Sequence, residues 1–280
     1  MARSFLITTD VHACFDEFVC LLEAAGFRLG GDRIAAPADG RRLLFGGDLV
    51  DRGPDPSFSL LLLDELVRAG QAELGALGNH DCTLLAALRD EPLPARTSGL
   101  NATLAELLRF PDPAAPRDAA LRLFERAPLR SVYRSERLLV THAAVFPVDR
   151  DGDGRARYLT DGVETAERDA LGRALKDFGW AEGWRGSGWQ VCCGHNTTCT
   201  RLPGTLAGGA VACLDSGCVF GGSLSGLLWP ERSFLTVPSL GAYASEPGEI
   251  RAALEPVGAE TFMADPARAA RWRAHLLARC

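Results

Sequence analysis

The chain has 280 residues with 47% apolar, 24% charged and 8% aromatic side chains, which is typical of a globular protein and excludes a disordered or collagen-like chain. No apolar run approaches the roughly 18 residues that a membrane-spanning helix needs, and the first residues show no signal-peptide pattern. We therefore expect a cytoplasmic protein with no membrane partner. The formal charge of -6 argues against bulk electrostatic binding of nucleic acid but leaves a local anion site open.

Short apolar runs alternate with segments of helical periodicity along the first half of the chain. The predicted strands are residues 5–9, 43–45, 74–77, 138–141, 190–193, 211–214, 224–229 and 233–237. The predicted helices are residues 15–25, 58–69, 82–88, 100–110, 119–126, 163–176 and 264–278. The early alternation predicts an α/β layered fold, and the closely spaced strands after residue 188 predict antiparallel pairing. We expect a sheet sandwich flanked by helices.

Neither a repeat nor a long linker divides the chain, so we expect one domain over residues 1–280, with a core at about 5–240 and a C-terminal helical extension at about 264–279. Residues 111–116 read as an exposed turn and residues 146–160 as a polar loop.

The nine cysteines are odd in number and form no CxxC pair, which predicts reduced thiols. Cys192 and Cys193 lie in an apolar run and are interpreted as small buried hydrophobes.

Four of the five histidines stand just after predicted strands, beside Asp, Asn, Gly or Thr. They are His12, His80, His142 and His195, whereas His275 stands apart in the last predicted helix. Ligand sites of open α/β sheets lie at the carboxyl ends of strands, so these separated residues can converge on one crevice. A single histidine at a strand end is usually a satisfied polar group, but four in this position favour a common site.

A mixture of carboxylate, imidazole and carboxamide donors follows these strands. The candidate ligands are Asp10, His12, Asp48, Asn79, His142 and His195. This mixture suits manganese, iron or zinc better than a thiolate site or a calcium cage. Six donors exceed the three that a catalytic zinc usually takes, whereas a bridging Asp48 would let them serve two ions about 3.5–4 Å apart. Such a pair would hold and acidify a water and polarise a phosphoryl oxygen, which predicts hydrolysis of a phosphate ester.

The motifs GDLVDRG at residues 47–53 and GNHD at residues 78–81, the upstream Asp-x-His and the two later histidines resemble the calcineurin-like metallophosphoesterases. The Asp-Arg-Gly triplet resembles the phosphoprotein-phosphatase branch. Residues 214–224, 228–231 and 237–239 are similar to a bacterial subgroup that contains diadenosine tetraphosphatases and the phosphatase domain of polynucleotide kinase-phosphatase. The resemblance covers about residues 5–240 and implies a metallophosphoesterase-type β-sandwich of two mixed sheets.

This resemblance implies that Asp10, His12 and Asp48 bind a first ion, and that Asp48, Asn79, His142 and His195 bind a second. Manganese is the expected metal, with iron, zinc, nickel or cobalt as alternatives.

Three further residues receive catalytic roles from the resemblance. His80 would protonate the leaving oxygen, Asp51 would orient His80, and Arg52 would clamp the phosphate. A carboxylate partner keeps an imidazolium charged, and a planar guanidinium can bind two phosphate oxygens. For Arg52, an ion pair with Asp51 is the alternative. Asp215 would be a ligand, an orienter of a ligating histidine, or the cap of a turn.

Some residues near these motifs have less certain roles. Arg155 or Arg157 would supply a second phosphate contact. Asp149 opens a stretch similar to an EF-hand loop, but the twelfth position is Thr160 instead of Glu, which favours a solvated turn. Ala13 and Ala144 replace two glycines of the family pattern, and a methyl group there would narrow the site or shift the backbone.

The expected function is two-metal hydrolysis of phosphomonoesters, as in a phosphoprotein Ser/Thr phosphatase, or of dinucleoside polyphosphates, by attack of a metal-bridging hydroxide. The expected partner is thus a phosphorylated protein, a dinucleoside polyphosphate or a nucleotide. Nucleic-acid ends are an alternative substrate that the net charge disfavours. Two functions of a different class also fit the sequence: a non-catalytic metal-binding scaffold, and a single-metal hydrolase that uses Cys192 or Cys193.

Overall fold

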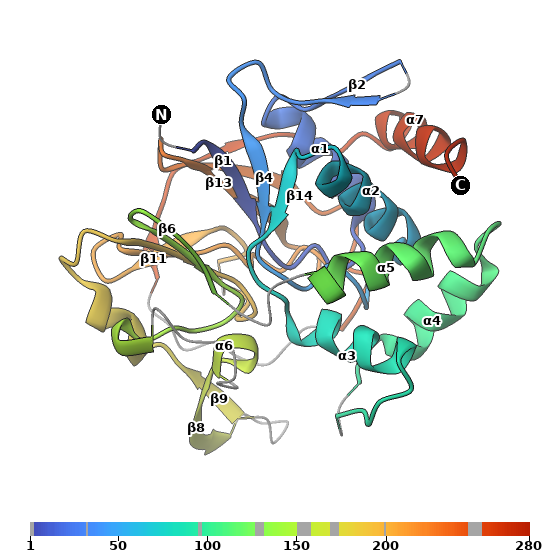
Figure 1. Ribbon diagram of the computed structural model, residues 1–280. Coiled ribbons are helices and arrows are strands. Elements are labelled where there is room, and N and C mark those ends of the chain that lie inside the picture. Colours follow the sequence, from blue (N-terminus) through green and yellow to red (C-terminus); the bar gives the residue numbers. More distant parts are fainter. Residues whose placement is uncertain are drawn as a thin grey trace.

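The computed structural model describes residues 3–31, 33–94, 97–126, 132–149, 158–168, 174–198, 200–245 and 254–280. Two six-stranded mixed sheets form its centre, and helices cover the outer face of the first sheet (Figure 1). This arrangement confirms the expected sandwich of two mixed sheets. Among the described residues, no helix is both long and apolar enough to cross a membrane.

The first sheet brings three strand ends to one edge. Its spatial order is β16 (Ala259–Thr261), β14 (Ser233–Pro238), β13 (Ser223–Trp229), β1 (Phe5–Thr8), β4 (Arg42–Phe45) and β5 (Ala72–Leu74). Strand β1 pairs antiparallel with β13 and parallel with β4, and β4 pairs parallel with β5. The carboxyl ends of β1, β4 and β5 therefore lie side by side.

The second sheet also brings the carboxyl ends of three parallel strands, β7 (Leu138–Thr141), β10 (Gln190–Cys193) and β12 (Val211–Cys213), to one edge. Its order is β15 (Glu255–Pro256), β11 (Gly204–Leu206), β12, β10, β7 and β6 (Val132–Ser135). Strand β10 is parallel to both β7 and β12. The expectation of antiparallel pairing after residue 188 is thus wrong for the pairing of β10 with β12, whereas the β11–β12 and β13–β14 pairs fulfil it. Strand β11 runs back along the outer side of β12, so β12 enters in the direction of β10.

The alternation of side chains along the central strands builds two cores. Phe5, Ile7 and Leu44 point toward the second sheet, where they pack in one cluster with Leu138 and Val140. The intervening residues of β1 and β4 pack against the helices: Leu6, Leu43 and Phe45. Because both faces of these strands are buried, their sequence reads as a continuous apolar run.

Helices α1 (Phe15–Ala24) and α2 (Pro56–Arg68) lie on the first sheet, and the other helices of this side pack on them or on one another: α3 (Asn79–Leu88), α4 (Leu100–Arg109), α5 (Ala114–Arg126) and α7 (Pro266–Leu277). Helix α1 contacts β13 and β14, α2 contacts β5, and α7 packs on α1 (Figure 1). Arg273 of α7 pairs with Asp16 and Asp55, and its guanidinium lies 4.9 Å from the centre of the Phe15 ring. The basic last helix is therefore a packing arm.

The remaining elements are the hairpin of β2 (Arg28–Gly30) and β3 (Arg33–Ala35), the short helices η1 (Pro147–Asp149), α6 (Tyr158–Asp161) and η2 (Gly179–Trp184), and the hairpin of β8 (Val163–Arg168) and β9 (Ala174–Asp177). The predicted helix over residues 163–176 is wrong. Val163 and Thr165 are β-branched and alternate with Glu164, a period-two pattern that favours a strand.

Smaller differences lie at element ends. Strand β5 covers Ala72–Leu74 and thus ends at the first residue of the predicted strand 74–77, and α5 begins at Ala114, inside the predicted turn. Pro116 is tolerated there because the first helical turn needs no backbone N–H.

Residues 150–157, with Arg155 and Arg157, lie outside the described residues. The eight cysteines that the structure describes are free, and the one-domain hypothesis stays a prediction.

We expect the Leu44→Ala variant to lose about 2–5 kcal/mol of unfolding free energy in urea denaturation, because Leu44 is fully buried between the two sheets and a cavity would remain. Leu108→Ala is the control, since Leu108 is 74% exposed and its loss should change stability by no more than about 0.5 kcal/mol. Equal effects of the two substitutions would contradict the described inter-sheet core.

Candidate metal centre and active site

The site begins where the parallel strands of the first sheet end. Asp10 follows β1, Asp48 follows β4, and Asn79 opens α3 after β5. The Asp10 N–H donates to the Gly47 carbonyl at 2.8 Å, and the His12 N–H donates to the Asp48 carbonyl at 2.9 Å. These backbone hydrogen bonds extend the β1–β4 pairing beyond the strands and place the two loops next to each other.

The second sheet adds its two histidines to the same place. His142 directly follows β7, and His195 follows β10 after Gly194, whose N–H donates to the His142 carbonyl at 2.7 Å. The His195 N–H donates to both carboxylate oxygens of Asp10 at 3.0 Å. All six predicted ligands are therefore brought to the edge where the two sheets meet, while His275 pairs with Glu65 elsewhere.

The backbone of this edge is strained. Left-handed φ angles between 45° and 71° occur at Asp10, His12, Ala13, Asp48, Asp51, Arg52 and His195. Each such non-glycine residue costs on the order of 1–3 kcal/mol and persists only where its surroundings fix it. Ala13, with φ 57°, thus adopts a conformation that a glycine would adopt without strain. Ala144 is fully buried and lies outside the left-handed region.

Glycines allow the loops to approach the candidate ligands. A Cβ at Gly78 would lie 1.9 Å from Asp48 Oδ1, and a Cβ at Gly194 would lie 1.8 Å from Asp10 Oδ2. Both distances are far below a van der Waals contact, so neither position accepts a side chain. The backbone of Gly78 and that of Gly194 therefore pack directly against the carboxylates of Asp48 and Asp10.

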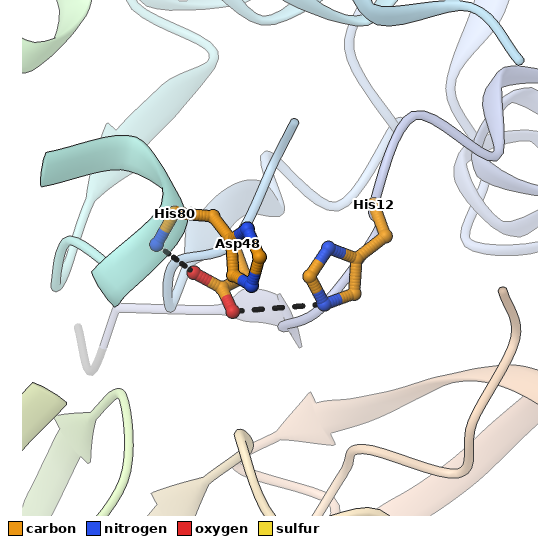
Figure 2. Close-up of side chains that lie close together, drawn as sticks. All are labelled: His12, Asp48 and His80. Atoms are coloured by element: carbon orange, nitrogen blue, oxygen red, sulfur yellow. Dashed lines mark hydrogen bonds and ion pairs between the residues drawn. The ribbon is translucent and has the colours of Figure 1, made fainter. Parts of the chain in front are cut away.

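Asp48 belongs to two groups of donor atoms at once. One group contains His12, Asp48 and His80, and the other contains Asp48, His142 and His195, with donor atoms within 4.8 Å of one another in each. Asp48 Oδ2 lies 3.6 Å from His12 Nε2 and 3.3 Å from His142 Nε2. Asp48 Oδ1 accepts a hydrogen bond from the His80 N–H at 3.0 Å (Figure 2). This sharing is the geometry that a bridging carboxylate needs.

The Nδ1 atoms of His12 and His142 each face a backbone carbonyl, and this contact determines the tautomer of the ring. His12 Nδ1 lies 2.9 Å from the Val50 carbonyl, and His142 Nδ1 lies 3.1 Å from the Gly46 carbonyl. A carbonyl can only accept, so each Nδ1–H donates and the lone pair of a neutral ring lies on Nε2, facing Asp48. His142 Nε2 is buried without a hydrogen-bond partner. Backbone carbonyls orient metal-ligating histidines in the same way, so the donors fit a divalent cation.

The acidic groups of the site strongly affect one another. Burial, followed by repulsion from Asp215 and Asp48, raises the pKa of Asp10 well above its ordinary value. Burial also opposes the charge on Asp48, but attraction to His142 and His80 outweighs it and holds the pKa of Asp48 well below its ordinary value. Asp48 is therefore an anion, and a nearby cation would offset its cost of burial.

The histidines divide into two kinds. Burial lowers the pKa of His12 and His195 well below the ordinary value, so these rings are neutral, the form that binds metal. For His142, burial also acts against the charge, yet attraction to Asp48 overcomes it and raises the pKa to about 10. A metal ion at Nε2 would have to displace that proton.

The proposed acid and its orienting carboxylate are in contact. His80 Nδ1 lies 2.7 Å from Asp51 Oδ2, and both side chains are buried. Arg52 Nη1 lies 3.1 Å from His12 Nε2, and the guanidinium is 5.5 Å from the centre of the Phe220 ring. Asp51 is thus engaged with His80, and Arg52 contacts His12, one of the candidate ligands.

Asp215 has a capping geometry. Its Oδ1 accepts from the Gly217 N–H at 3.0 Å, and its Oδ2 accepts from Thr197 Oγ1 at 2.9 Å. These contacts match the cap of a turn. Asp215 also lies close enough to Asp10 to raise the pKa of that carboxyl.

Two residues that sequence reasoning gave no role hold the site together. Asp81 Oδ2 accepts from the Asp48 and Gly78 N–H groups at 2.8 and 3.1 Å, and burial followed by repulsion from Asp48 raises its pKa to about 7. Thr103 Oγ1 donates to Asp51 Oδ1 at 2.6 Å. The signal for Asp81 was its place as the fourth residue of GNHD, whereas Thr103 lies in none of the motifs described above.

A model of the calcineurin-like phosphoesterase family matches residues 3–197. An asymmetrical bis(5'-nucleosyl)-tetraphosphatase PrpE of Halalkalibacterium halodurans is 31% identical over 246 residues, which are 86% of this chain and 96% of that protein. The enzyme of the same name from Bacillus subtilis is 32% identical over 83% of this chain and 93% of its own length.

Solved structures agree with this likeness. The crystal structure of a candidate diadenosine tetraphosphatase has a TM-score of 0.58 and 25% identity, and the match covers 85% of this chain and 95% of the other. A protein serine/threonine phosphatase from Saccharomyces cerevisiae, with a TM-score of 0.52 and 14% identity, covers 81% of this chain and 72% of its own and shares the fold. The chain belongs to the calcineurin-like phosphoesterase family and is a hydrolase that acts on phosphate esters or anhydrides.

Proposed function

We propose that this chain is a two-metal hydrolase of dinucleoside polyphosphates. The observation that carries the proposal is the position of Asp48 between two groups of donor atoms. The names of the relatives support the substrate class, because they describe asymmetrical bis(5'-nucleosyl)-tetraphosphatases. Their similarity extends over 83–86% of this chain and 93–96% of the relatives. The cytoplasmic location expected from the sequence is part of the same proposal.

In this proposal, Asp10, His12 and Asp48 hold one cation, and Asp48, Asn79, His142 and His195 hold the other. Asn79 Oδ1 and His195 Nδ1 support this assignment because they lie only 3.0 Å apart. Manganese is the metal we propose, since it accepts a mixture of oxygen and imidazole donors. When bound, the cations lower the pKa of a water and offset the charge that develops on the phosphoryl oxygens.

The protein residues then act on the substrate itself. The Arg52 guanidinium binds two phosphoryl oxygens. Water attacks phosphorus and releases a proton to solvent, the bond between phosphorus and the leaving oxygen breaks, and His80 gives that oxygen the proton on Nε2. Solvent then returns a proton to His80. Asp51 accepts the hydrogen bond of His80 Nδ1–H and stabilises the charged ring. Asp215, as the cap of a turn, supports the loop beside Asp10 in this scheme.

We expect the purified protein with Mn²⁺ to convert diadenosine tetraphosphate and water into ATP and AMP, the asymmetrical products. Chromatography of the products distinguishes this outcome from the formation of two ADP. A phosphoserine peptide and a 5'-phosphorylated oligonucleotide should react with kcat/KM values lower by about tenfold or more, because each would forgo about 1.4 kcal/mol or more of transition-state binding. A faster reaction with either one would replace the substrate class.

The Asp48→Asn variant should lose about 10³-fold or more of this activity, the upper range for removal of one electrostatic group. Asparagine has nearly the same shape, so the fold should survive, as circular dichroism can check. Asp118→Asn is the matched control, because the Asp118 side chain on α5 is 51% exposed, and it should keep full activity. Full activity of Asp48→Asn would refute the metal assignment.

Removal of metal by a chelator should abolish hydrolysis, and elemental analysis of the reloaded protein should give two metal ions per chain. Reloading should also raise the melting temperature by roughly 5–10 °C when the metal is at about 100 times its Kd, because binding favours the folded state. Activity that survives the chelator would contradict the proposal. Reloaded Asp48→Asn should contain fewer than two ions.

A further inference from the structure

Thr103 ends a line of buried hydrogen bonds that leads to the proposed acid. Its Oγ1 donates to Asp51 Oδ1 at 2.6 Å, and Asp51 Oδ2 lies 2.7 Å from His80 Nδ1. Thr103, Asp51 and His80 are 2%, 1% and 5% exposed, so water does not compete for these bonds. The two oxygens of one carboxylate are thus held from opposite sides.

The start of α4 is shaped to hold this carboxylate. Gly99 precedes the helix with φ 93°, and a Cβ there would lie 2.8 Å from both the Arg52 nitrogen and Asp51 Cβ. The Thr103 N–H donates to the Gly99 carbonyl, so both residues belong to the first turn. The N-terminus of a helix carries partial positive charge, which favours the Asp51 anion beside it.

We propose that Thr103 is a positioning residue for the hydrolysis reaction, and that α4 fixes the His80 ring through Asp51. This inference rests on the proposed function, in which His80 protonates the leaving oxygen. With His80 as its only side-chain partner, the Asp51 carboxylate could turn about its last torsion and carry the ring with it. The hydroxyl of Thr103 stops that rotation and so fixes the direction of the His80 Nε2–H bond.

The chemistry of the leaving group separates this role from a general loss of structure. A poor leaving group such as phenolate needs the proton of the acid, whereas p-nitrophenolate leaves readily without it. A displaced His80 should therefore slow the hydrolysis of phenyl phosphate and spare that of p-nitrophenyl phosphate. Damage to the metal ligands or to the fold would slow both reactions equally.

The experiment compares Thr103→Val with Thr103→Ser in the full chain loaded with Mn²⁺. Valine keeps the branched shape and removes the donor, while serine keeps the donor. For Thr103→Val we expect kcat with phenyl phosphate to fall by about 10- to 50-fold, a part of the 10²- to 10⁴-fold contribution of a general acid, and kcat with p-nitrophenyl phosphate to fall less than about threefold. Thr103→Ser should stay within about threefold of the wild type on both esters.

Thr236→Val is the matched control, because Thr236 is 1% exposed and its hydroxyl lies 3.2 Å from Thr261 Oγ1, outside the site. It should keep the wild-type rates on both esters. An equal fall of Thr103→Val on both esters, no fall on either, a serine variant as slow as valine, or a metal content below the wild type would each overturn the inference. If the wild type hydrolyses neither of these esters nor diadenosine tetraphosphate, the proposed function fails and the role of Thr103 fails with it.

Discussion

The burial of one carboxylate, that of Asp48, governs the arrangement of this site. A buried anion is costly unless it has hydrogen-bonding or charged partners, and both carboxylate oxygens of Asp48 have such partners. Its Oδ1 accepts from the first turn of α3, and its Oδ2 faces the Nε2 atoms of His12 and His142. Asp81 holds its backbone N–H. These partners come from three segments, the loop after β1, the start of α3 and the loop after β7, so both sheets, α3 and the loops must be in place before the charge is stabilised.

The strain of the strand ends depends on the same assembly. Left-handed backbone at Asp10, Asp48 and His195 turns each chain sharply just after its strand and aims the side chain across the edge. The cost is sustained because the strands are fixed on both faces, by the helices on one side and by the second sheet on the other. The inter-sheet core around Leu44 lies behind the site and holds its strands in place.

The sequence allowed the prediction of what depends on local pattern. The central strands are buried on both faces and therefore appear as apolar runs, and the candidate ligands were identified because each follows such a run. The direction of β12 depends on the path of β11, and the β8–β9 hairpin on a weak period-two pattern, so both were predicted wrongly. The roles of Asp81 and Thr103 depend on hydrogen bonds across 33 and 52 residues, which no local pattern encodes.

The segment from Gly47 to Arg52 explains why the longest motif is contiguous although the ligands are scattered. Asp48 belongs to both groups of donor atoms, and Asp51, three residues later, holds His80, the proposed acid. One short loop therefore links the candidate metal donors to the proposed acid. Asp81 ties this loop to α3, and Thr103 ties it to α4. Since phosphoryl transfer requires nucleophile and leaving oxygen in line with phosphorus, a displacement of this loop would misalign both ends of the reaction at once.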